Sequence, residues 1–170
     1  MPHEDLPLTI RPATPDDAGP VSRILNEIVL DGTHSLLGRT FSEVEERAFI
    51  AAFPECGVFL VAELRGDGIV AFQALEPYLP DMVAHRHVAT MGTWVAAAHR
   101  RRGIATRLSE ATFAAARERG FRKVFTDIRA DNPDSLPFHR SLGFEVVGVA
   151  RRQARLGEQY VDVVYIEREL

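Results

Sequence analysis

The spacing of hydrophobic residues changes its period along the chain. Residues 8–13 alternate between apolar and polar side chains, as a short strand does, and residues 57–78 read as two strands joined at the turn "RGDG". Another strand is expected over 87–95. From Ile104 the apolar residues recur every three or four positions, which predicts one face of a helix. The pattern therefore mixes strands and helices.

Capping residues place two helices in the first third of the chain. Thr14 can cap a helix whose first turn holds a proline and two acidic residues, which suit a helix start. Ser42 and Glu45 have the spacing of a capping box, which predicts a second helix running toward Phe53.

The second half reads as strand, helix, strand, helix and two strands. The helix from Ile104 should end near Gly120. The remaining elements are expected to be a strand over 123–128, a short helix within 132–144 with Asn132 as its N-cap, and strands over about 144–153 and 159–167. This order predicts an α/β (α+β) domain, mostly antiparallel at first, with a βαβ crossover later.

Composition narrows the classes of protein that fit. A chain of 170 residues suits a single domain over 1–170, and the net charge of −4 argues against a general nucleic-acid binder. Cys56 is the only cysteine, so a disulfide within the chain and a multi-cysteine zinc site are excluded. Residues 1–13 lack the pattern of a signal peptide, and no stretch is apolar enough to span a membrane. We expect a cytoplasmic protein.

The segment "VAAAHRRRGIAT", residues 95–106, collects positive charge where a strand gives way to a helix. The first amides of a helix lack partners within it and attract anions. Gly103 lets a ligand approach the backbone, and Ala105 keeps the next exposed position small. A pyrophosphate suits this turn. A solvated helix end and a nucleic-acid patch are the alternatives.

Two motifs resemble one enzyme family. Walker and Rossmann glycine patterns are missing, whereas Arg100-x-x-Gly103-x-Ala105 resembles the [RQ]-x-x-G-x-[GA] acetyl-CoA signature of GNAT N-acetyltransferases. "NPDSLPFHRSLGFEVVG", starting at Asn132, is similar to that family's later motif. His139, seven residues after the asparagine, makes the phosphinothricin-acetyltransferase-like branch the most similar.

The resemblance implies a central sheet of six to seven strands flanked by helices. It also implies direct acetyl transfer from acetyl-CoA to a primary amine of a small molecule, with an amino acid or its analogue favoured, and no metal. Backbone N–H near Val95, between two splayed strands, would polarise the thioester carbonyl, and Asn132 would bind the pantetheine arm. The implied cofactor-binding residues are Trp94, Val95, Arg100, Arg101, Arg102, Gly103, Ile104, Ala105, Thr106 and Asn132.

The same resemblance makes His139 the candidate general acid for the departing thiolate. The general base is open, because Thr90 stands where the phosphinothricin-acetyltransferase branch tends to have a glutamate. Candidates for base or substrate contacts are Glu27, Glu76, His87, Arg152 and Tyr160.

Other functions stay open at this point. A protein N-terminal or polyamine acetyltransferase fits the same motifs. A non-catalytic acyl-CoA sensor would keep the cofactor motifs without turnover. A nucleic-acid module would use the arginines as a phosphate patch, against the acidic total charge. We expect neither a nucleic-acid partner nor a membrane; a homodimer is common in the family.

Overall fold

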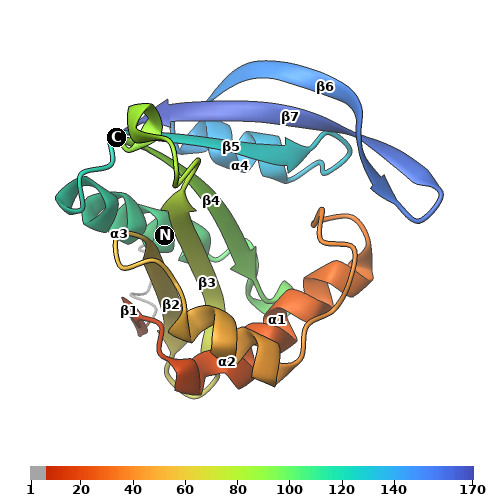
Figure 1. Ribbon diagram of the computed structural model, residues 1–170. Helices are drawn as coiled ribbons and strands as arrows, with labels where there is room; N and C mark the ends of the chain where they lie inside the picture. Colours follow the sequence, from red (N-terminus) through yellow and green to blue (C-terminus); the bar gives the residue numbers. More distant parts are fainter. Residues whose placement is uncertain (1–6) are drawn as a thin grey trace, which may run out of the picture.

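A twisted mixed sheet with helices on both faces organises the chain in the computed structural model, which describes residues 7–170 (Figure 1). Its strands are Leu8–Pro12 (β1), Val58–Leu64 (β2), Gly68–Pro77 (β3), Val88–Val95 (β4), Lys123–Arg129 (β5), Glu145–Leu156 (β6) and Gln159–Glu169 (β7). Its α-helices are Ala18–Asp31 (α1), Glu43–Ala51 (α2), Ile104–Glu118 (α3) and Ser135–Ser141 (α4). Short 3-10 turns cover Pro15–Asp17, Val83–His85 and Ala97–His99.

The strand order is β1-β2-β3-β4-β5-β7-β6, a seven-stranded sheet in which only β4 and β5 pair in parallel. The predicted fold class, the hairpin at "RGDG" and the crossover from β4 through α3 to β5 are confirmed. The parallel pairing covers only Val88–Ala89 against Lys123–Val124. Beyond that point β4 and β5 diverge, which opens a gap in the middle of the sheet (Figure 1).

Two hydrophobic layers fill the two faces of the sheet. One packs α3 and α4 against β2–β5, with Leu75, Ile104 and Leu108 among its fully buried side chains. The other packs α1 and α2 against β2–β4, with Val21 and Phe72 buried. The alternating side chains of each strand thus reach different helices, and the β4–β5 gap lies between the two layers.

Several capping predictions hold, and one is wrong. Ser42 and Glu45 form the expected capping box of α2, and Gly120, at φ +93°, follows the end of α3. Asn132 does not cap α4: the N-cap is Asp134, and the Asn132 side chain accepts a hydrogen bond from the Asp134 N–H at 3.1 Å. An asparagine that binds the backbone two residues on makes an Asx turn, so the helix starts later than predicted.

Residues 1–6, on which part of the signal-peptide expectation rests, lie outside the described range. None of the described helices is long and apolar enough to cross a membrane.

Candidate active site

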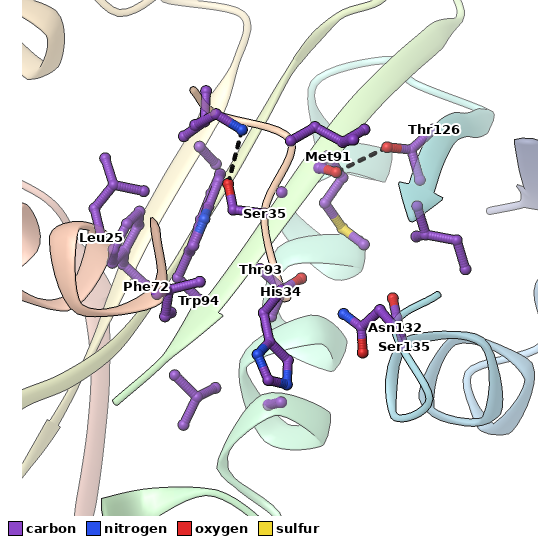
Figure 2. Close-up of a pocket in the computed structure, with 18 of the residues that line it drawn as sticks. Leu25, His34, Ser35, Phe72, Met91, Thr93, Trp94, Thr126, Asn132 and Ser135 are labelled. Carbon is purple, nitrogen blue, oxygen red and sulfur yellow. Dashed lines mark hydrogen bonds between the residues drawn. The ribbon is translucent and has the colours of Figure 1, made fainter. Parts of the chain in front are cut away.

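A cavity of about 1170 Å³ lies at the β4–β5 gap. It is lined by α1, α2 and the loop between them, by β3–β5, by the turn before α3 and by the start of α4. Figure 2 shows His34 and Ser35 of the α1–α2 loop between Trp94 on one side and Asn132 and Ser135 on the other. Segments far apart in the sequence therefore converge on one site.

The pairing of β4 decides which peptide groups face the gap. Tyr78 N–H and Ala96 N–H bond across the β3–β4 pair to Val88 and Val70 carbonyls, so the even-numbered residues of β4 pair with β3. The odd-numbered residues, including Val95, direct their peptide groups toward β5. Since β5 has diverged there, the Val95 N–H points into the gap.

The Thr126 side chain connects β5 to β4 where the gap starts to open, and it also accepts a hydrogen bond from the Thr90 hydroxyl at 3.4 Å. Thr126 of β5 donates its hydroxyl to the Met91 carbonyl at 2.9 Å, as Figure 2 shows. A side chain here replaces a ladder hydrogen bond, which holds the two strands apart while keeping their relative position. The splayed strands that the resemblance implied are present.

The N-terminus of α3 opens onto the same cavity. Gly103 has φ +75°, and an added Cβ would meet no atom within 4 Å, so ligand atoms can approach the backbone. The helix that follows starts at Ile104, and Ile104, Ala105 and Thr106 line the cavity. This arrangement has the free amides and positive dipole end that bind a phosphate group.

The three arginines of the turn have different surroundings. Arg100 donates through Nε to the Val95 carbonyl at 3.2 Å and lies 3.7 Å from Asp31. Arg101, at φ +60°, forms an exposed ion pair of 2.9 Å with Asp134 at the start of α4. Arg102 is exposed and does not line the cavity. Arg100 thus braces the turn, and Arg101 connects both sides of the cavity mouth.

Among the other predicted site residues, Val95, Asn132 and His139 line the cavity together with the α3 turn. His139 is only 8% exposed and lies edge-on to Phe138 and Phe144. Trp94 also lines the cavity, but its ring stacks on Phe72 at 4.7 Å in the layer beneath α1 and α2.

Three predicted substrate residues lie elsewhere. Glu27 is exposed on α1 and accepts a hydrogen bond from the Ala97 N–H at 3.1 Å. His87 precedes the far end of β4, and its carbonyl accepts from Lys123 N–H at 3.1 Å. Tyr160, on the β6–β7 hairpin, is 48% exposed beneath the Arg152 guanidinium at 4.2 Å. None of these residues lines the cavity.

Glu76 does line it, and its position on β3 bears on the missing base. The register places Glu76 directly opposite Thr90 of β4, so both side chains lie on the face toward α1 and α2. Asp127 of β5 lines the cavity as well, and burial raises the pKa of its carboxyl group. A carboxylate is therefore present one strand away from Thr90.

Two buried, charged residues that line the cavity were not predicted from the sequence. Glu46 of α2 is one of three glutamates near the helix start, and only packing distinguishes it: it is 5% exposed, and burial raises the pKa of its carboxyl group. Arg129, at the end of β5, is 4% exposed and donates to the carbonyls of Gly32 and Ser35 at 2.6 and 3.1 Å. No spacing signal in the sequence pointed to either residue.

Within residues 7–170 no group of three or more His, Cys, Asp or Glu side chains is arranged to hold a metal ion.

Comparisons with known proteins identify the family of the chain. The family model described as the acetyltransferase (GNAT) family matches residues 27–144. No curated protein matches the chain. Because the family model spans more than half of the sequence, the chain belongs to the GNAT acetyltransferase family, and the family prediction is confirmed.

Solved structures share the whole fold. A ribosomal-protein-alanine N-acetyltransferase from Brucella melitensis has a TM-score of 0.88 and 25% identity, with 95% of this chain and 99% of that chain covered. The protein yncA from Salmonella typhimurium, with its cofactor acetyl-CoA, has a TM-score of 0.88 and 22% identity, with 96% of this chain and 94% of that chain covered. A phosphinothricin acetyltransferase from Sinorhizobium meliloti, in complex with acetyl-CoA, has a TM-score of 0.88 and 22% identity, with 97% of this chain and 89% of that chain covered.

Proposed function

We propose that this protein transfers the acetyl group of acetyl-CoA to a primary amine of a small molecule. The observation that carries the proposal is the single cavity into which both the open N-terminus of α3 and the Val95 N–H point. Two structural neighbours hold acetyl-CoA, and the chain is a GNAT acetyltransferase.

The residues present fit acetyl-CoA. Amides of residues 104–106 and the open space above Gly103 would hold the pyrophosphate, with Arg101 as a nearby cation. Asn132, whose side-chain oxygen already accepts from Asp134, has its amide group left to donate toward a pantetheine arm. The Val95 N–H would donate to the thioester carbonyl.

When bound, acetyl-CoA supplies an acetyl thioester whose carbon–sulfur bond is exchanged for a carbon–nitrogen bond to the amine. The protein must therefore remove one proton from the amine nitrogen and deliver one proton to the sulfur. We assign proton removal to Glu76, directly or through one water. Glu76 lines the cavity and lies opposite Thr90, on the face of the sheet toward α1 and α2.

We assign proton delivery to His139. Its Nδ1 donates to the Ser135 carbonyl at 2.8 Å, so the transferable proton would be on Nε2. Burial lowers the pKa of the imidazole, so the protonated form is the minor one at neutral pH. An imidazolium is still a stronger acid than a thiol, whose ordinary pKa is about 8.5.

The test is release of free thiol from acetyl-CoA, measured with a panel of amino acids, amino-acid analogues, polyamines and short peptides. Thiol release together with an acetylated small amine supports the proposal. Binding of acetyl-CoA without release in any reaction would favour a sensor domain instead.

A peptide N-terminus is the second candidate acceptor. The Brucella melitensis neighbour is a ribosomal-protein-alanine N-acetyltransferase and is 25% identical to this chain. A peptide with an N-terminal alanine in the same panel separates this alternative from small amines.

We further propose a homodimer in the cytoplasm. The edge strand β6 exposes Val146, Val147 and Val149, which would suit contact with a second copy. Sedimentation analysis of the chain and cell fractionation test these two points.

A further inference from the structure

The part of the cavity between the α1–α2 side and the sheet, termed here the acceptor half, combines apolar walls with carboxylates. Its walls are Leu25, Ile28, Phe41, Phe49, Phe72, Ala74 and Trp94. Its acidic lining residues are Glu45 and Glu46 on α2, Glu76 on β3 and Asp127 on β5. A ligand here meets aromatic surface and negative charge together.

The buried carboxylate of Glu46 has no partner in the protein. The Glu46 side chain forms no hydrogen bond or ion pair with any residue in 7–170, although the residue is only 5% exposed. Glu45, its neighbour, instead caps α2 and pairs with Arg39 at 2.9 Å. Glu46 lines the cavity and its carboxylate oxygens keep access to that space, so a positively charged group of a ligand there can pair with them.

The cationic side chains around the acceptor half are already bound. Arg39 pairs with Glu45 and lies 4.0 Å from the centre of the Phe41 ring. Arg129 pairs with Asp131 through two bonds of 2.8 Å and donates to two loop carbonyls. The charge of each guanidinium is already balanced by a carboxylate of the protein, Glu45 for Arg39 and Asp131 for Arg129, so neither adds net positive charge to the acceptor half.

We propose, resting on the proposed acetyltransferase function, that the acceptor half selects primary amines with an apolar body and no carboxylate group. Glu46 pairs with the ammonium form of the acceptor as it binds, and the aromatic walls bury the carbon skeleton. The ammonium loses one proton to water before the attack, so that the neutral amine reacts and gives its second proton to Glu76. A carboxylate on the acceptor would lie near three carboxylates that lack ion pairs, Glu46, Glu76 and Asp127, and would be repelled. This departs from the amino-acid acceptor that the sequence favoured.

The direct test uses amines that differ only by a carboxylate, with the full chain and saturating acetyl-CoA. Phenethylamine is compared with phenylalanine, and cadaverine with lysine. We expect kcat/KM for the carboxylate-free member of each pair to be higher by about tenfold or more. Faster turnover of the carboxylate-bearing members overturns this inference but leaves the acetyltransferase function standing. If neither pair and no amine of the wider panel gives thiol release, the acetyltransferase function itself is overturned.

A variant of the buried glutamate supplies an independent readout. Glu46→Gln should raise KM for the preferred amine by about tenfold while leaving KM for acetyl-CoA unchanged. The same variant should raise the melting temperature, because a neutral amide replaces a buried carboxylate without a partner. Glu43→Gln, an exposed glutamate on the same helix, is the matched control and should change neither quantity. An unchanged amine KM in Glu46→Gln overturns the inference.

Discussion

The Nδ1 atom of His139 lies 2.8 Å from the carbonyl oxygen of Ser135, one helical turn earlier on α4. A carbonyl can only accept, so Nδ1 carries a proton and Nε2 is the atom left to exchange one with a ligand. This hydrogen bond fixes the ring, and the aromatic neighbours of His139 keep it from water.

The first prediction separates ring placement from proton delivery. His139→Asn places an amide near the position of Nδ1 and removes Nε2, so it should lower kcat by about 10²-fold while changing KM for acetyl-CoA much less. The wild-type kcat should also decline as pH rises above the imidazole pKa, which lies below its ordinary value. A pH profile of kcat for both proteins checks this. An unchanged kcat in the variant rules out the acid role.

Burial of the same imidazole gives stability a pH dependence. Since the folded-state pKa is lowered, the unfolded chain binds the proton first as pH falls through about 6.5. The His139 contribution is therefore complete above that pH and diminishes below it. Thermal unfolding between pH 8 and about pH 5 should show a smaller loss for His139→Asn than for the wild type; equal losses would contradict it.

The second prediction concerns the helix N-terminus. Gly103→Ala should raise KM for acetyl-CoA by about tenfold, because a methyl group would occupy the space where the ligand approaches the backbone. The positive φ also costs about 1–2 kcal/mol for a residue with a Cβ. Steady-state kinetics and thermal unfolding measure the two effects.

Gly66→Ala is the control for Gly103→Ala. Gly66 also has a positive φ, +96°, with open space around its Cβ position, but it lies in the β2–β3 turn away from the cavity. It should lose similar stability without a change in KM. A KM increase of equal size in both variants would show that strain alone is responsible.

The third prediction concerns the base. Glu76→Gln should lower kcat by about 10²- to 10³-fold while changing KM for acetyl-CoA much less. Glu63→Gln, on the neighbouring strand β2 and outside the cavity, should leave kcat unchanged. If Asp127→Asn lowers kcat by this amount and Glu76→Gln does not, the proton acceptor is on β5 instead.

The fourth prediction concerns Arg129. Its donors hold the α1–α2 loop through Gly32 and Ser35, so Arg129→Met should raise KM for the amine more than KM for acetyl-CoA. Loss of these charged hydrogen bonds should also lower the free energy of unfolding by about 1.5–3 kcal/mol. Arg155→Met, which removes an exposed pair with Glu158, is the control and should have little effect. Equal KM changes for both substrates would contradict the loop-anchoring role.

The fifth prediction concerns acid stability. Two hydrogen bonds of 2.8 Å from Arg11 lower the pKa of Asp17 to about 2. Stability from this pair is present above the ordinary Asp pKa of about 3.9 and is lost as pH falls toward 2. Asp17→Asn should therefore flatten the unfolding curve measured between pH 5 and about pH 2. A curve parallel to that of the wild type would contradict it.

Local patterns were sufficient for most of the fold. Strand alternation, the capping box at Ser42 and the glycine after α3 depend on residues close in sequence, and each prediction holds. The Asn132 cap was wrong because two local hydrogen-bonding modes compete for the same side chain. The 3-10 turn at Ala97–His99 was also not predicted, and it offsets Arg100 from the helix start.

The acceptor half depends on contacts that the sequence does not display. Glu46 differs from Glu43 only in which face of α2 meets the sheet, and Arg129 meets residues almost a hundred positions earlier. The opposition of Glu76 and Thr90 requires the register of β3 and β4. The acceptor half therefore depends on tertiary packing, whereas a short local motif predicts the turn before α3 that would bind acetyl-CoA.

The central claim is acetyl transfer from this cavity, and a paired assay tests it most directly. The wild type and Gly103→Ala are each mixed with acetyl-CoA and phenethylamine, and thiol release and acetylated amine are measured together. We predict equal amounts of thiol and N-acetyl product for the wild type, and a higher KM for acetyl-CoA in the variant. Acetyl-CoA binding with no acetylated product from phenethylamine or any amine of the panel would contradict the claim.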